Sequence, residues 1–187
     1  HPPAIDLPVG LSESTVYLCL PVTLRGAPEF DVSEQFNSTA RFASEESDVV
    51  DAISGVATDP WGYTNRISNF ESFSGSYQDD VLKGTNTTAY TEVYRGLLGS
   101  DTIDGRGGQD RVEYDRDAYY GGKLGVVVNL ARGTGRDGFG TTDRLYNIEQ
   151  AGGTAFADKL TGNGSANQLY GHDGNDSLDG GAGNDVL

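Results

Sequence analysis

The residues best suited to chemistry in this chain are aspartates that recur at a fixed distance from a glycine. Six stretches that we take as repeats have a glycine, an aspartate five residues later, and a large apolar residue two residues after that. The six pairs are Gly75/Asp80, Gly96/Asp101, Gly105/Asp110, Gly153/Asp158, Gly171/Asp176 and Gly180/Asp185. Carboxylate oxygens are hard ligands, so an evenly spaced series of aspartates indicates binding of a hard cation.

The elements that must position these aspartates are tight turns followed by short strands. The best preserved turn, residues 180–185, reads GGAGND. Glycine adopts positive backbone dihedral angles and lets main-chain carbonyls approach a common point. The apolar residue after each aspartate then enters a strand and points inward. Because two nonapeptides complete one coil, residues eighteen apart should lie on neighbouring rungs, with Asp158 beside Asp176 and Asn167 beside Asp185.

Carboxylates stacked in this way repel one another. At a separation of ~4 Å and an effective dielectric constant near 20, the repulsion is roughly 4 kcal/mol per pair. A cation between them would remove it. Calcium accepts about six to eight oxygens in flexible geometry, which suits carboxylates together with glycine carbonyls better than the strict octahedron of magnesium or the nitrogen and sulfur ligands of zinc. The spacing therefore predicts Ca²⁺.

The nonapeptide G-G-x-G-x-D-x-U-x, where U is a large apolar residue, resembles the calcium-binding repeat of the RTX (repeats-in-toxin, haemolysin-type) family. The resemblance implies an all-β fold, a parallel β-roll or β-helix solenoid, with Ca²⁺ as its bound ion. Candidate metal-binding residues in the second half of the chain are Gly153, Asp158, Asn167, Gly171, Asp173, Gly174, Asp176, Gly180, Gly181, Gly183 and Asp185. Those in the first half are Asp80, Gly96, Gly99, Asp101, Gly105, Gly108 and Asp110.

Several departures from the repeat lead us to expect stronger calcium sites in the second half. Asn167 stands where aspartate belongs, which should weaken one site there. In the first half the stretch 84–95 is three residues longer, and Glu92 is its only acid. Leu97 and Arg106 replace the second glycine of their repeats, which should restrict those turns and bring Arg106 near any metal.

A longer repeat organises the chain into two like units. Shifting the sequence by 78 residues lays 49–84 on 127–162 without a gap, with 13 identities in 36 positions. We therefore divide the chain into a first unit, 34–112, and a second unit, 113–187, which ends within a nonapeptide. Residues 1–33 match neither unit and are interpreted as an extended linker or the edge of a preceding module, with a strand over 15–23.

Composition narrows the possible partners. The chain has 28 acidic and 13 basic residues and a formal net charge of -15. So strong a negative charge repels nucleic acid and anionic membranes and attracts divalent cations, so nucleic acid is excluded as a partner. No stretch approaches the ~18 apolar residues that span a bilayer. The single cysteine, Cys19, cannot form an internal disulfide and is interpreted as a small buried side chain.

Two other patterns resemble functional sites, but the residues around them favour other interpretations. Residues 133–138 match G-x-G-x-x-G, but no helix of useful length is expected after them, so a turn between strands is favoured over a nucleotide loop. His172 beside Asp173 could suggest acid–base chemistry, but it occupies a turn position and should face solvent, and no nucleophile is indicated. The sequence therefore predicts no catalytic residues.

Three functional interpretations remain open. The favoured one is a non-catalytic, calcium-stiffened structural segment of a secreted or cell-surface protein such as an adhesin, with other protein subunits or surface polysaccharide as further partners. In the RTX family such segments are exported unfolded and fold in the higher calcium concentration outside the cell. The second is an accessory module of a secreted protease, lipase or polysaccharide epimerase, with catalysis elsewhere. The third is a carbohydrate-binding surface that uses tyrosines such as Tyr119 and Tyr120.

Overall fold

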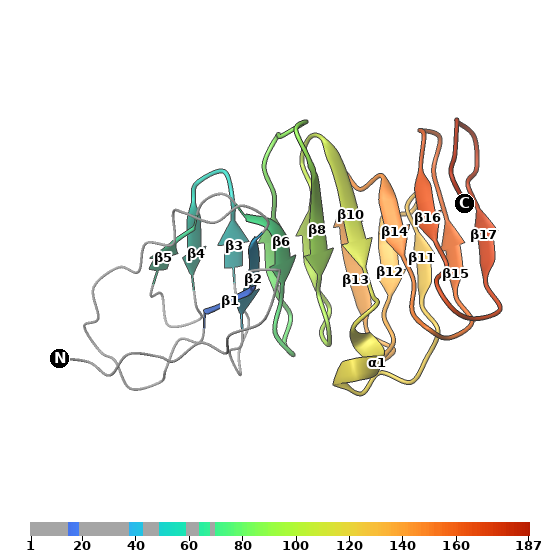
Figure 1. Cartoon of the computed structure of the whole chain (residues 1–187), viewed down its shortest axis with the longest axis horizontal. Helices are drawn as coiled ribbons and strands as arrows, with labels where there is room; N and C mark the ends of the chain where they lie inside the picture. Colours follow the sequence, from blue (N-terminus) through green and yellow to red (C-terminus); the bar gives the residue numbers. More distant parts are fainter. Residues whose placement is uncertain (1–14, 19–37, 43–48, 59–63, 68–69) are drawn as a thin grey trace.

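The strands of this protein stand side by side along the long axis of the molecule (Figure 1). The computed structural model describes residues 15–18, 38–42, 49–58, 64–67 and 70–187, and almost all regular structure in these ranges is β-strand. The one helix in the described part is the single turn α1 (Asp117–Tyr120).

The strands form two sheets. The seven-stranded sheet contains, in spatial order, β1 (Thr15–Leu18), β2 (Ser38–Phe42), β6 (Phe70–Ser74), β8 (Thr91–Arg95), β10 (Gln109–Glu113), β14 (Gln150–Gly152) and β16 (Gln168–Tyr170). The ten-stranded sheet contains β17 (Ser177–Asp179), β15 (Lys159–Thr161), β11 (Val127–Asn129), β12 (Thr134–Arg136), β13 (Thr142–Tyr146), β9 (Thr102–Asp104), β7 (Val81–Lys83), β3 (Val49–Asp51), β4 (Val56–Thr58) and β5 (Thr64–Arg66).

The chain winds between these sheets as a parallel β-roll. From β6 to β10, and again from β14 to β17, consecutive strands alternate between the two sheets. Each strand pairs in parallel with the strand two places along the chain, as β6 does with β8 and β15 with β17. The predicted all-β parallel roll is confirmed.

Two rows of turns connect the sheets. Edge 1 is the set of turns that lead from the seven-stranded to the ten-stranded sheet, namely residues 75–80, 96–101, 153–158 and 171–176. Edge 2 is the set that leads back, namely residues 84–92, 105–110, 162–167 and 180–185. Because the roll is regular, turns on one edge stack on one another, and so do their aspartates.

The register of the strands follows the nonapeptide count. In the second unit Lys159 pairs with Ser177 and Gln150 with Gln168, each an offset of 18 residues. In the first unit Val81 pairs with Thr102, an offset of 21. The difference is the three extra residues of stretch 84–95, which lengthen a turn on edge 2 and leave the strands in register.

An antiparallel meander interrupts the roll once in each unit. Strands β11, β12 and β13 form it in the second unit, and β3, β4 and β5 lie 78 residues earlier in the first. Both sheets run on between the units, because β10 pairs with β14 and β9 with β13. The division at residue 112 describes the sequence repeat and stays a prediction as a domain boundary.

The core lies between the two sheets. The ten-stranded sheet contributes Leu82, Ile103 and Leu160, and the seven-stranded sheet contributes Phe73 and Tyr94, all at most 1% exposed. The Phe73 and Tyr94 rings stack with centroids 5.5 Å apart. Side chains that alternate with these point outward, as the period of a strand requires.

Some expectations fall wholly or partly outside the described residues. Cys19 and residues 1–14 and 19–33 lie there, and of the strand expected over 15–23 only β1 is described. Residues 133–138 are described and contain β12, a strand of the meander, which agrees with a turn-and-strand interpretation rather than a nucleotide loop. Within the described ranges no helix is both long and apolar enough to cross a membrane.

Candidate metal-binding turns

The turns that follow the strands are of two kinds. In a closed turn the second residue donates its main-chain N–H to the acidic or amide side chain that ends the turn. Ser76 donates to Asp80 Oδ2 at 2.6 Å, Thr154 to Asp158 Oδ2 at 2.6 Å, and Asn163 to Asn167 Oδ1 at 2.7 Å. The longer turn 84–92 does the same, with Thr85 donating to Glu92 Oε2 at 2.8 Å.

In an open turn the second residue has a positive φ, and its main-chain N–H does not donate to the aspartate that ends the turn. This is so at Leu97, Arg106, His172 and Gly181, with φ between 64° and 83°. The Arg106 N–H, for example, donates to Asp104 at the end of the preceding strand, 3.0 Å away. The fourth residue of each open turn is a glycine with φ between 132° and 139°, at Gly99, Gly108, Gly174 and Gly183.

Every closed turn stacks on an open turn of the next rung. On edge 1 the N–H of Asp80 donates to Asp101 Oδ1 at 2.8 Å, and the N–H of Asp158 to Asp176 Oδ1 at 3.0 Å. On edge 2 the N–H of Asn167 donates to Asp185 Oδ1 at 2.9 Å. The stacking predicted from the 18-residue repeat is confirmed, and this bond fixes one carboxylate of each pair over its neighbour.

The fourth glycine of the open turn leaves a space into which oxygens point. A Cβ atom on Gly174 would lie 2.3 Å from the Phe156 carbonyl oxygen and 2.9 Å from Asp176 Oδ1. On Gly99 it would lie 2.4 Å from the Gln78 carbonyl oxygen and 3.1 Å from Asp101 Oδ1. A carbonyl of the closed turn and a carboxylate of the open turn therefore converge where a side chain would otherwise stand, and only glycine permits it.

The first glycine of each turn has a second role, because the turn's own acid folds back over it. A Cβ atom on Gly153 would lie 2.2 Å from Asp158 Oδ2. The same crowding by the turn's own aspartate is found at Gly75, Gly96, Gly105, Gly171 and Gly180. A side chain at the first position would block the carboxylate from folding back over the turn. Gly181 has a different role, because it adopts the positive φ of the second position in its turn.

The open turns at Asp101 and Asp110 bury carboxylates without a compensating positive charge. Asp101 and Asp110 are each 1% exposed, and the Oδ2 atom of each has no hydrogen-bond partner. Burial raises the pKa of Asp110 to about 8, and the nearby carboxylates Glu92 and Glu149 add to the shift. Burial also raises the pKa of Asp101, and repulsion from the Asp143 carboxylate adds to the shift. In the described part of the chain no basic side chain pairs with either aspartate.

These groups fit a calcium ion. Each pair of turns offers one or two carboxylates and several main-chain carbonyls, all hard oxygens. Among the described residues no three His, Cys, Asp or Glu side chains converge as a metal site, so the main chain must supply most of the ligands. That rules against zinc, which takes its ligands from side-chain nitrogen and sulfur. A bound Ca²⁺ would neutralise the stacked carboxylates and accept the unpartnered oxygens.

Comparison with known families agrees with this geometry. The family model of the RTX calcium-binding nonapeptide repeat matches in four copies, over residues 86–120 and 152–187. These parts of the chain are RTX calcium-binding repeats, a class that binds Ca²⁺ and is not itself catalytic. No curated protein matches the chain.

Two of the candidate metal-binding residues, Asn167 and Asp173, differ in their surroundings from the buried aspartates. Both amide atoms of Asn167 are used: Oδ1 accepts from Asn163, and Nδ2 donates to the Glu149 carbonyl oxygen at 3.0 Å. An aspartate could not make the second bond, so asparagine here links two rungs. Asp173 is exposed at the third position of its turn. Whether these and the other candidates bind calcium stays a prediction.

The departures from the repeat at Leu97 and Arg106 change their turns less than expected. Leu97 and Arg106 adopt the same positive φ as Gly181, so the open turn forms without the second glycine. The Arg106 guanidinium is held 2.9 Å from Asp51 Oδ2 at the end of β3, which gives it a partner outside its own turn. The higher ranking of the second unit's sites therefore loses part of its basis and stays a prediction.

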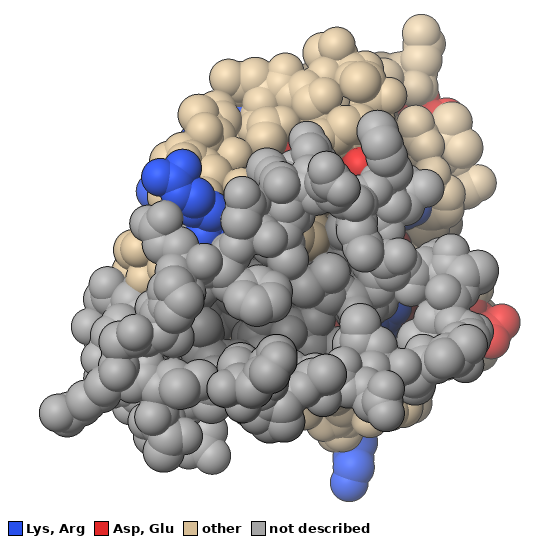
Figure 2. Space-filling model, turned by 60° about the vertical axis from the view of Figure 1, so that its left-hand side comes forward, with Lys and Arg blue, Asp and Glu red and all other residues tan. Residues whose placement is uncertain are grey.

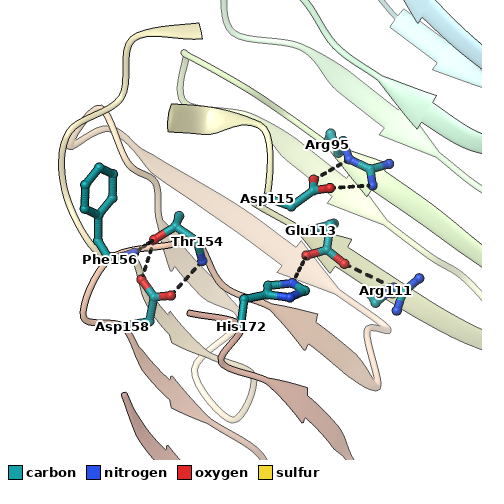
Figure 3. Close-up of polar contacts among 8 residues, drawn as sticks. All are labelled: Arg95, Arg111, Glu113, Asp115, Thr154, Phe156, Asp158 and His172. Atoms are coloured by element: carbon teal, nitrogen blue, oxygen red, sulfur yellow. Dashed lines mark hydrogen bonds and ion pairs between the residues drawn. The ribbon is translucent and has the colours of Figure 1, made fainter. Parts of the chain in front are cut away.

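His172 does not simply face solvent. Its side chain is 43% exposed, but Nε2 lies 3.0 Å from Oε1 of the buried Glu113 (Figure 3). Glu113 also lies 3.4 Å from Arg111 Nε. The second residue of turn 171–176 is thereby tied to the end of β10, two strands away in the sheet. Figure 3 also shows the closed turn beside it, in which Thr154 caps Asp158.

Glu92 is a candidate site residue that the five-residue glycine-to-aspartate spacing did not identify. It is fully buried, lies opposite Asp110 in the strand register, and takes the place of the closed-turn aspartate. Its Oε1 and the nearby Tyr94 hydroxyl have no partner. The signal in the sequence was that it is the only acid in stretch 84–95, but an eight-residue separation from Gly84 broke the pattern.

Replacing Gly174 by alanine should impair calcium binding at turn 171–176. The added Cβ would meet the Phe156 carbonyl, and a φ of 132° is strained for any residue with a side chain. We expect at least about a tenfold loss of affinity at this pair of turns, measured by calorimetric titration. Gly164→Ala is the matched control, because no atom lies within 4 Å of its Cβ and its φ is not positive. Equal affinities for the two variants would contradict the geometry.

The metal-free protein should lose stability as pH rises. The pKa of Asp110 is about 8 when folded and near 3.8 when unfolded, so the folded chain binds the extra proton between these values. The stabilisation is complete below about pH 4 and is lost as pH rises through about 8. Urea unfolding in metal-free buffer, started near pH 4 where Asp110 is protonated in the folded chain, should show this fall, and Asp110→Asn should flatten it. A slope that is equally steep in the variant would show that Asp110 does not cause it.

Proposed function

We propose that this chain is a non-catalytic calcium-binding β-roll segment of a secreted or cell-surface protein, and that it folds when it meets Ca²⁺ outside the cell. The observation that carries the proposal is the pair of buried, unpartnered carboxylate oxygens on Asp101 and Asp110, each in a turn where carbonyl oxygens also converge. Such groups are costly unless a cation compensates them.

Charge explains why folding and calcium binding should be coupled. The chain carries a net charge of -15, and the roll gathers acids onto two edges. Figure 2 shows only scattered acidic atoms among the described residues on the face that it presents. Asp80, Asp101, Asp110 and Asp158 are each at most 3% exposed. Without Ca²⁺ these acids repel one another in the folded state, so the binding free energy becomes folding free energy. A low calcium concentration would keep the chain unfolded and a high one would fold it.

Circular dichroism with and without Ca²⁺ tests this coupling. Strand signal and a cooperative melting transition should appear with millimolar Ca²⁺ and largely disappear with a chelator. Mg²⁺ and NaCl at matched ionic strength serve as controls, because charge screening alone would be reproduced by either. A spectrum and melting temperature that do not change on chelation would contradict the proposal.

The same roll could serve as the accessory module of a secreted enzyme. What supports this reading is that the repeats have a hydrophobic core of their own between the two sheets, so they can serve as a module beside a catalytic part of a longer protein. The coding sequence on both sides of this segment decides it: a neighbouring hydrolase or epimerase domain favours the accessory role, and further repeats favour the structural one.

A carbohydrate-binding role is favoured by one surface feature. Tyr119 on α1 is 83% exposed and packs edge-on to Tyr120 at 4.9 Å, which in turn meets Tyr77 of edge 1 at 6.1 Å. Exposed aromatic groups of this kind mark interaction surfaces.

The test of this role is titration with neutral cello- and xylo-oligosaccharides, chosen because the acidic chain repels acidic polymers. Tyr119→Ala should weaken binding at least about tenfold, the loss of one stacking contact of about 1.4 kcal/mol. The control is Tyr146→Ala, at a half-exposed tyrosine on β13, which should leave binding unchanged. Absence of binding to the unaltered protein would exclude these sugars as ligands.

A further inference from the structure

The loop before β13 repeats the spacing of the metal-binding turns. Gly138, Asp143 and Leu145 stand at the same separations as glycine, aspartate and apolar residue in the nonapeptides. This stretch lies outside the residues matched by the RTX family model. It belongs to the meander, and its last residues pair in parallel with β9, with Arg144 opposite Thr102. That register places Asp143 beside Asp101.

The contacts of this loop reproduce those between stacked turns. The N–H of Asp101 donates to Asp143 Oδ1 at 3.0 Å, as the N–H of Asp80 does to Asp101 Oδ1. The fourth residues also meet, because the Gly99 N–H donates to Thr141 Oγ1 at 3.3 Å. Loop 138–143, which joins β12 to β13 within the ten-stranded sheet, therefore stacks as a third turn on the edge 1 turns 75–80 and 96–101.

Four buried aspartates lie around loop 138–143, and among the described residues no basic side chain pairs with them. Asp143 and Asp137 are fully buried, and Asp101 and Asp117 are 1% exposed. Asp137 is satisfied by N–H groups of its own loop, and Asp117 by the Gly138 N–H at 2.8 Å. In the described part of the chain none of the four forms an ion pair.

The unpartnered group at the junction is Asp101. Asp101 lies between Asp80 and Asp143 in this column: its carboxylate Oδ1 accepts from the Asp80 N–H, its own N–H donates to Asp143 Oδ1, and its Oδ2 accepts from nothing. Asp143 accepts the Tyr114 hydroxyl at 2.8 Å and the Asp101 N–H, but no cationic donor. Two buried carboxylates are thus held on adjacent rungs with one oxygen unsatisfied, the arrangement that a hard cation relieves.

We propose that Ca²⁺ also binds between Asp101 and Asp143, at a site outside the nonapeptide repeats that joins the last edge 1 turn of the first unit to the meander of the second. The inference rests on the proposed calcium-binding function and extends it to the junction. A site here would make the calcium-dependent folding of the two units cooperative, because removing the ion would leave like charges facing each other across their boundary.

The ion count of an Asp143→Asn variant tests the site. Asparagine keeps the size of the side chain and one acceptor oxygen but removes the charge. Equilibrium dialysis with radioactive Ca²⁺ should show one ion fewer per chain than in the unaltered protein. Asp117→Asn is the matched control, equally buried in the same cluster but bonded to Gly138 rather than facing Asp101, and it should retain the full count. An unchanged count in Asp143→Asn would overturn the site.

A second measurement needs no variant and covers the case in which Asp143→Asn does not fold. Crystals of the unaltered protein grown with Tb³⁺, which takes calcium sites, should show an anomalous difference peak between Asp101 and Asp143. Peaks at the paired nonapeptide turns without one at the junction would overturn this inference and leave the proposed function standing. No peak at any turn would overturn the proposed function itself.

Discussion

The bond from the main-chain N–H of one turn's acid to the carboxylate of the next rung is the interaction on which the sites depend. It recurs at Asp80/Asp101, Asp158/Asp176 and Asn167/Asp185, and again at the junction between Asp101 and Asp143. One bond both aligns neighbouring coils and holds a charged group over another polar turn. When the coils stack in this way, the carboxylates of neighbouring turns come close and repel one another. A bound cation would remove that repulsion.

The alternation of closed and open turns gives each side of a site a different task. A closed turn satisfies its own acid through the second residue, as Thr154 does for Asp158, and presents a carbonyl to its neighbour. In an open turn the N–H of the second residue does not reach the aspartate that ends the turn. The Oδ2 atom of that aspartate then has no donor, as at Asp101 and Asp110. Glycine at the fourth position removes the side chain that would fill the space between them.

Much of this architecture could be read from local spacing. Each nonapeptide contributes one turn and one short strand, so the count from Asp158 to Asp176 sets the register without knowledge of the rest of the chain. The inward-pointing residue two places after each acid, such as Leu82 or Leu160, follows from the period of a strand. These features are local, and local spacing in a regular solenoid propagates unchanged.

The sequence by itself therefore determined the all-β roll, the stacking of its turns and the class of ion that suits them, because those depend on residues near one another in the chain. The tertiary structure alone decided which acids face each other across long separations. Glu92 reaches the closed-turn position only because an enlarged turn folds back, and Asp143 meets Asp101 only because the meander pairs β13 with β9. His172 likewise finds Glu113 through the sheet order. Contacts of this kind are set by sheet pairing between distant segments, which a repeat count does not specify.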